Sequence, residues 1–126
     1  MSKITAILKR NDIMEPKAYK ISVAIPAEFR DELLDAVNSS MRQLYPGYDR
    51  AFSITRTEGT WRSLEGSDPF IGKVGEITTA EELRIEFVIA ADDLKKVISA
   101  IRKVHPYEEP GIDILPMILW KDVIGP

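Results

Sequence analysis

The chain contains no cysteine, and its 126 residues include a single histidine, His105. The absence of cysteine excludes a disulfide framework, an iron–sulfur cluster, a thiolate zinc site and a cysteine nucleophile. One histidine cannot supply the several imidazole ligands of a typical transition-metal site within one subunit. We therefore predict no cofactor and no metal, with His105 shared across subunits as the one weak metal candidate.

Long apolar runs and an excess of positive charge are also lacking. No run approaches the ~20 residues that a membrane-spanning helix needs. The apolar patch at residues 4–8 is too short for the core of a signal peptide. The formal net charge is −3, which gives no electrostatic footprint for DNA or RNA. We expect a cytoplasmic protein that binds neither membrane nor nucleic acid.

The composition that remains is ordinary for a globular domain, with 44% hydrophobic and 29% charged residues. The length suits one domain that can bury a core without disulfides or metals. We expect an N-terminal arm over residues 1–16, one domain over 17–120 and a short tail over 121–126.

Two periodicities indicate the secondary structure. Apolar residues alternate with polar ones over 19–25 and 83–89, which is typical of half-buried strands. Apolar residues recur at helical spacing over 29–44 and 94–104. The predicted order is strand 19–25, helix 29–44, strand 52–57, a long connection 58–76, strand 83–89, helix 94–104 and strand 112–120.

The two halves also match each other at an offset of 64 residues, which pairs Ile21 with Ile85 and Leu33 with Val97. A doubled strand-helix-strand unit predicts the α+β ferredoxin-like fold, an antiparallel sheet with both helices on one face. The other face of that sheet would be bare. A symmetric copy is its simplest cover, so we expect a homo-oligomer. We assign to this face Ser22, Ala24, Thr55, Val88, Leu115 and Met117.

Three segments are more specific than the periodicities. Residues 57–76 read TEGTWRSLEGSDPFIGKVGE, residues 82–86 read ELRIE, and residues 105–110 read HPYEEP. Together they resemble the insert domain of the Nif-three-like proteins, a family often labelled GTP cyclohydrolase I type 2 homologues. The last segment also resembles the divalent-ion-tolerance protein CutA. The resemblance extends over about residues 19–119.

The resemblance has implications for fold and activity. Both groups have PII-like versions of the ferredoxin-like fold, which commonly assemble as trimers. The dinuclear metal site of the Nif-three-like proteins belongs to a surrounding core domain that this sequence does not contain. The chain looks like the insert domain standing alone, so we predict that it is not an enzyme.

The segment His105–Glu109 allows two interpretations. One imidazole beside carboxylates could form part of a metal or anion site, completed by other subunits. Alternatively, the segment is a rigid corner in which prolines fix the backbone and Tyr107 packs. We favour the corner. An unpaired buried carboxylate is expensive, so we predict that Glu108 or Glu109 meets a backbone N–H or a cation.

The long connection 58–76 does not match a phosphate-binding loop, because no Gly-Lys-Ser/Thr follows its glycines. In PII-like proteins the corresponding connection contacts partners and borders a cleft between subunits. We predict a non-catalytic, self-associating module with a regulatory or scaffolding role. The alternative is a sensor of small ligands or divalent metals with sites between subunits. The candidate ligand-binding or partner-binding residues are Glu58, Trp61, Arg62, Glu65, Lys73, His105, Tyr107, Glu108 and Glu109.

Overall fold

The computed structural model describes residues 15–125. Except for its last two residues, the predicted N-terminal arm lies outside this range. The elements are β1 (Ala18–Ile25), η2 (Ala27–Phe29), α2 (Arg30–Ser40), β2 (Ser53–Arg62), β3 (Ile77–Ala90), η3 (Ala91–Asp93), α3 (Leu94–Val104), β4 (Gly111–Met117) and α4 (Trp120–Ile124).

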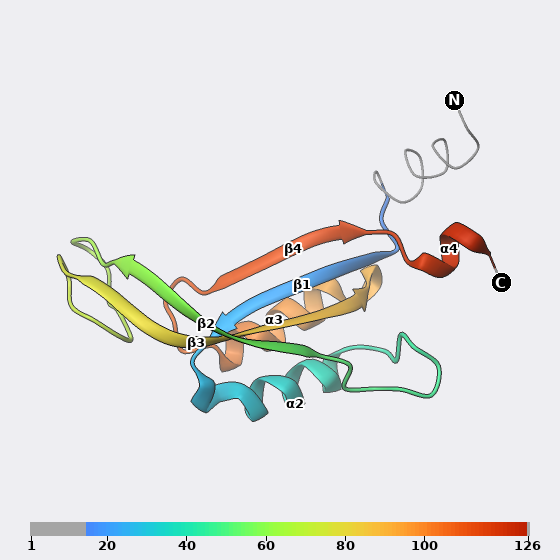
Figure 1. Ribbon diagram of the computed structural model, residues 1–126, viewed down its shortest axis with the longest axis horizontal. Helices are drawn as coiled ribbons and strands as arrows, with labels where there is room; N and C mark the ends of the chain where they lie inside the picture. Colours follow the sequence, from blue (N-terminus) through green and yellow to red (C-terminus); the bar gives the residue numbers. More distant parts are fainter. Residues whose placement is uncertain (1–14, 126) are drawn as a thin grey trace.

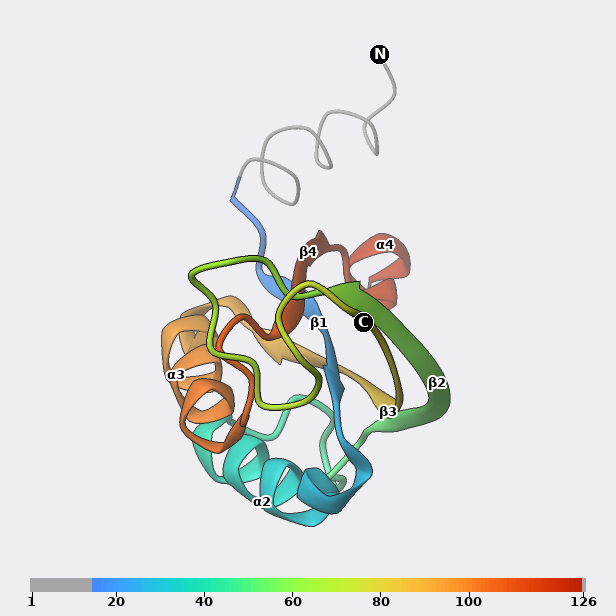
Figure 2. The same ribbon diagram turned by 90° about the vertical axis from the view of Figure 1, so that its left-hand side faces the viewer.

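The four strands form one sheet in the order β2-β3-β1-β4, and every neighbouring pair is antiparallel. Helices α2 and α3 lie side by side on one face of this sheet (Figure 2). This arrangement confirms the predicted α+β ferredoxin-like fold.

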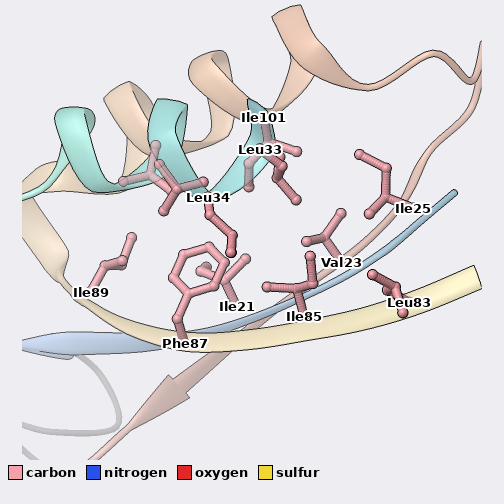
Figure 3. Close-up of a cluster of buried hydrophobic side chains, with 12 residues drawn as sticks. Ile21, Val23, Ile25, Leu33, Leu34, Leu83, Ile85, Phe87, Ile89 and Ile101 are labelled. Carbon is pink, nitrogen blue, oxygen red and sulfur yellow. The ribbon is translucent and has the colours of Figure 1, made fainter. Parts of the chain in front are cut away.

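The core lies between the sheet and the two helices (Figure 3). Alternate residues of β1 and β3 point toward the helices, and α2 and α3 return apolar side chains to meet them. Burying one such side chain completely stabilises the fold by about 1.5–3 kcal/mol. The largest fully buried side chains are Ile21, Val23, Ile25, Leu33, Val37, Ile85, Ile89, Val97 and Ile101.

Helix α2 ends at Ser40, four residues before the predicted end at Leu44. The hydroxyl of Ser40 donates to the carbonyl of Ala36, which gives that carbonyl a local partner. Two residues later, the backbone N–H of Arg42 donates to the carboxylate of Asp93 at 2.9 Å. This contact with η3 replaces the next helical hydrogen bond, which the apolar stripe could not reveal.

The predicted connection 58–76 begins too early but ends at the correct residue, and the strand predicted over 83–89 begins too late. β2 continues to Arg62 and β3 begins at Ile77, so the true loop is 63–76. The two strands form a hairpin that continues beyond the helices, with its loop at the opposite end of the molecule from α4 (Figure 1). This extension has no helix to pack on, so it lacks the apolar alternation that marks the rest of the sheet.

The face of the sheet away from the helices is mixed in chemistry. The register places all six predicted residues on it. It also carries an ion pair between Lys20 and Glu86 at 3.3 Å and a hydrogen bond from Arg84 to Ser22 at 3.1 Å. Leu115 stays 55% exposed. The face is therefore more polar than the sequence analysis assumed.

The C-terminal residues add a strand and a short helix. β4 is an edge strand, so Pro116 removes no hydrogen bond from the middle of the sheet. The predicted tail is largely taken up by α4, in which Trp120 and Ile124 are exposed. None of the helices within residues 15–125 is long and apolar enough to cross a bilayer.

Candidate functional site

A cavity of about 320 Å³ lies where the β2–β3 hairpin leaves the body of the sheet. One wall comes from β2 and the loop after it, and the opposite wall comes from the segment between α3 and β4. β1, β3 and β4 each contribute one residue. The lining residues are Ala24, Gly59, Thr60, Trp61, Ser63, Ser67, Pro69, Phe70, Ile71, Glu82, Tyr107, Glu108, Glu109 and Gly111.

Three aromatic rings line the cavity. The ring of Tyr107 lies 5.6 Å from that of Trp61 and 6.2 Å from that of Phe70, measured between centroids. The rings are tilted by 55° and 45° rather than stacked face to face. They come from β2, from the loop 63–76 and from the segment before β4, so the cavity depends on the hairpin meeting the corner after α3.

A buried carboxylate lies beside these rings. Glu82 in β3 is only 7% exposed, and its Oε2 accepts a hydrogen bond from the hydroxyl of Tyr107 at 2.7 Å. Its carboxylate lies against the backbone of Gly59, where a β-carbon would collide with it. Burial is the main cause that raises the pKa of Tyr107 well above its usual value, and the hydrogen bond to Glu82 raises this pKa further. Tyr107 thus keeps its proton as the donor.

His105 anchors the corner behind this cavity. Its Nε2 lies 2.6 Å from the carbonyl oxygen of Ala24 in β1, and its Nδ1 accepts from the backbone N–H of Tyr107 at 3.2 Å. This pair of contacts fits the neutral ring with its proton on Nε2. Burial, aided by the charge of Arg102, lowers the pKa of His105. Both ring nitrogens are occupied by backbone, which agrees with the corner interpretation.

The rest of the corner is held by charged side chains. Arg102 donates to the carbonyl of Tyr107 at 3.1 Å. The carboxylate of Glu108 accepts from the backbone N–H of Asp68 at 2.6 Å, which ties the corner to the loop 63–76. The predicted contact with a backbone N–H is therefore present at Glu108, but both glutamates are exposed, so burial is not its cause.

The structure brings together only part of the predicted set. Trp61, Tyr107, Glu108 and Glu109 line the cavity. The other five candidates, Glu58, Arg62, Glu65, Lys73 and His105, lie outside its lining, and all of them except His105 are exposed.

The predicted set of site residues did not include Gly59, Phe70 and Glu82, which line the cavity. Strand alternation places Glu82 on the open face with Arg84 and Glu86, but no sequence signal shows that Tyr107 reaches it. Within residues 15–125, no group of three or more histidine, aspartate or glutamate side chains is arranged to hold a metal ion.

Comparison with known proteins identifies relatives of this chain. No family model matches the chain. A GTP cyclohydrolase 1 type 2 homolog of Halalkalibacterium halodurans is 31% identical over 122 residues, which cover 94% of this chain and 33% of that protein. The chain thus spans about a third of the length of this curated relative.

Solved structures also match this chain. A Bacillus cereus protein related to NIF3 matches 80% of this chain and 26% of its own, with 29% identity and a TM-score of 0.69. CutA1 from a psychrotrophic Shewanella matches 81% of this chain and 82% of its own, with 15% identity and a TM-score of 0.60. The GlnK–ATP complex of Bacillus subtilis matches at 13% identity and a TM-score of 0.56, covering 80% and 84% of the two chains. The last two likenesses show the fold alone.

Proposed function

Because the chain is a homologue of one domain of the Nif-three-like proteins, the GTP cyclohydrolase 1 type 2 homologues, and has the PII/CutA-like fold, we propose that it is a self-associating regulatory module rather than an enzyme. The observation that carries the proposal is the sheet face that the helices leave open. The catalytic activity named for the longer relatives is assigned to no residue of this chain.

The open face has the properties of a surface that meets a copy of itself. It combines exposed Leu115 with small residues such as Ala24 and with the paired charges of Lys20 and Glu86. Contacts between copies of this chain would cover the apolar groups and keep the charges paired. Most assemblies of identical chains are closed and symmetric, and a threefold ring forms when different parts of such a face meet on neighbouring copies. The PII-like resemblance favours this trimer.

Light scattering at micromolar concentration tests this proposal. We expect a mass of three chains. Leu115→Lys places a charge on the open face and should lower the mass toward that of one chain. Tyr48→Lys is the control, since Tyr48 is 71% exposed in the segment between α2 and β2. A single-chain mass for the unaltered protein would reject the proposal, and a dimer would reject the trimer.

The hairpin supports the further part of the proposal, that partner contacts occur through residues 58–76. Its far end exposes Leu64 at 67% and Val74 at 48%, and Ile77 beside it is 66% exposed. Apolar side chains on an extension beyond the body of the fold suit contact with another protein. Replacing Leu64 and Val74 by serine should weaken partner binding without changing the oligomer mass.

The cavity favours a second candidate, a sensor that binds a small ligand or a divalent metal at sites between subunits. A specific ligand would raise the melting temperature by mass action, whereas a pure interaction module would not respond. A thermal-shift screen with nucleotides and divalent cations therefore separates the two candidates. Removal of the response by Glu82→Gln would assign it to the cavity.

A further inference from the structure

The charged residues that line the cavity at the base of the hairpin are all acidic. Three of its lining residues are glutamates, Glu82, Glu108 and Glu109. Its lining residues, all of which the structure describes, include no lysine, arginine or histidine. An anionic ligand would therefore meet only repulsion from the charged groups at this site, whereas a cation would be attracted.

The carboxylate of Glu82 has one oxygen to offer. Oε2 accepts a hydrogen bond from the hydroxyl of Tyr107, but within residues 15–125 no side chain donates a hydrogen bond to Oε1. This oxygen belongs to a residue that is 7% exposed, and it borders Gly59 in the wall of the cavity. It is accessible there, since no fully buried side-chain oxygen of the described residues lacks a hydrogen-bond partner. A buried carboxylate is stabilised by a partner that carries positive charge or donates a hydrogen bond.

The aromatic rings add a second element of recognition. Trp61, Phe70 and Tyr107 line the same cavity and are tilted against one another. A cation over the face of such a ring is attracted by the ring's negative π-face, most strongly for tryptophan. The rings also offer apolar surface to the carbon atoms attached to the charge.

The size of the cavity and the placement of its acids distinguish an organic cation from a metal ion. About 320 Å³ lies at the small end of the range for ligand pockets. The acids of the described residues nowhere gather in a group of three that could coordinate a metal. The cavity thus places its one buried carboxylate beside an aromatic surface, in a space that suits a small molecule.

We propose that this cavity binds a small organic cation whose ammonium or guanidinium group meets Oε1 of Glu82 and whose carbon body lies against Trp61, Phe70 and Tyr107. The proposal deepens the second candidate function and does not require self-association. The cation is a free small molecule, or a lysine or arginine side chain of a second copy, which offers the same chemistry.

Choline and 3,3-dimethylbutan-1-ol form a matched pair of probes, because they share size and shape and differ in charge. The chain has two tryptophans, so Trp120→Phe leaves Trp61 as the only indole reporter. We expect choline to change the fluorescence of Trp61 and to bind about ten-fold more tightly than its neutral isostere. Acetate, tested as an anion, should not bind.

Two neighbouring glutamates provide the control. Glu82→Gln removes the negative charge but keeps an oxygen that can accept the hydroxyl of Tyr107. Glu81→Gln makes the same change on the other side of β3, where the side chain is exposed. We expect Glu82→Gln to weaken choline binding by about ten-fold or more and Glu81→Gln to leave it unchanged. Circular dichroism of both variants confirms that each is folded.

The oligomer mass of the same samples distinguishes a free cation from a lysine or arginine side chain of a second copy. Choline binding at constant mass supports a free ligand. If a side chain of a second copy fills the cavity, choline and Glu82→Gln will both lower the mass at fixed concentration, and Glu81→Gln will not. The proposal is overturned if both probes bind equally, or if the two variants agree in both measurements. A single-chain mass together with choline binding would reject self-association alone.

Discussion

The two ends of strand β3 lie in different environments, although they belong to one continuous strand. Its C-terminal half, from Leu83 to Ile89, buries alternate side chains under the helices. Its N-terminal part, from Ile77 to Glu81, pairs with β2 in the hairpin and exposes most of its side chains. One end is stabilised by burial of apolar area. The other is held by its pairing with β2 and, at the adjacent Glu82, by the hydrogen bond from Tyr107. Substitutions should therefore have large and general effects at the first end and small and local effects at the second.

The sharpest contrast is between two isoleucines of β3. Ile85 is fully buried, whereas Ile77 is 66% exposed. We expect Ile85→Ala to lower the free energy of unfolding by about 2–5 kcal/mol, because it leaves a cavity in a packed core. Ile77→Ala should change it by no more than about 0.5 kcal/mol. Urea unfolding measures both, and equal losses would remove the distinction between the two ends.

The second contrast uses two glycines that line the cavity. A β-carbon at Gly59 would collide with the carboxylate of Glu82, whereas at Gly111 it would meet nothing within 4 Å. We expect Gly59→Ala to destabilise the protein by about 1–3 kcal/mol, because Glu82 must leave its place beside Tyr107. Gly111→Ala should be neutral within about 0.5 kcal/mol.

Thermal and urea unfolding compare the two alanine variants under the same conditions. If both glycine substitutions are neutral, the carboxylate of Glu82 can move freely. Its close approach to Gly59 then contributes nothing to the free energy of unfolding.

A smaller effect is expected when the hydroxyl of Tyr107 is removed. Tyr107→Phe leaves the ring among its aromatic neighbours but takes the hydrogen-bond donor from Glu82. The loss of a donor to a charged group costs about 1–3 kcal/mol, and access to the cavity keeps the value at the low end. Tyr48→Phe, at a site that is 71% exposed, is the matched control. A loss in Tyr107→Phe no larger than in the control would show that Glu82 finds another partner.

The predictability of the molecule follows the same division. Apolar periodicity identified β1, the buried half of β3 and both long helices, because each of these has one face in the core. It could not give the length of the hairpin, whose strands pair through backbone groups that any residue supplies. It also could not place Glu82 beside Tyr107. That contact joins residues 25 positions apart in the chain and depends on the register of three strands.

The family resemblance identified the segments that line the cavity, but it did not identify the roles of their residues. The HPYEEP segment, residues 105–110, was the strongest motif in the sequence, and its histidine is occupied by two backbone groups. The two glutamates of the same motif lie at the cavity instead. A short motif therefore contains residues that line the cavity, while the contacts that each of its residues makes could be read only from the coordinates.

The smallest expected effect concerns the pH dependence of stability through His105. Its pKa is lowered in the folded protein, mainly by burial, so the folded chain resists protonation more than the unfolded chain does. The stabilisation is fully present above the unfolded pKa of about 6.5 and declines as the pH falls below that value. In that window the free energy of unfolding should increase with pH. Protonation would also place a second N–H at Nδ1, opposite the backbone N–H of Tyr107.

Urea unfolding between pH 7.5 and pH 5 measures this dependence. His105→Gln should flatten it, because the chain has no other histidine and the titration of its α-amino group is common to both proteins. The buried carboxylate of Asp93, held by Arg42, has a lowered pKa, so the stability that it adds is present throughout this pH range and is lost only at more acidic pH, below the usual pKa of aspartate. An unchanged slope in His105→Gln would show that the imidazole is equally easy to protonate in the folded and unfolded chains. The corner would then be held by its prolines and by Arg102 rather than by the two hydrogen bonds of the ring.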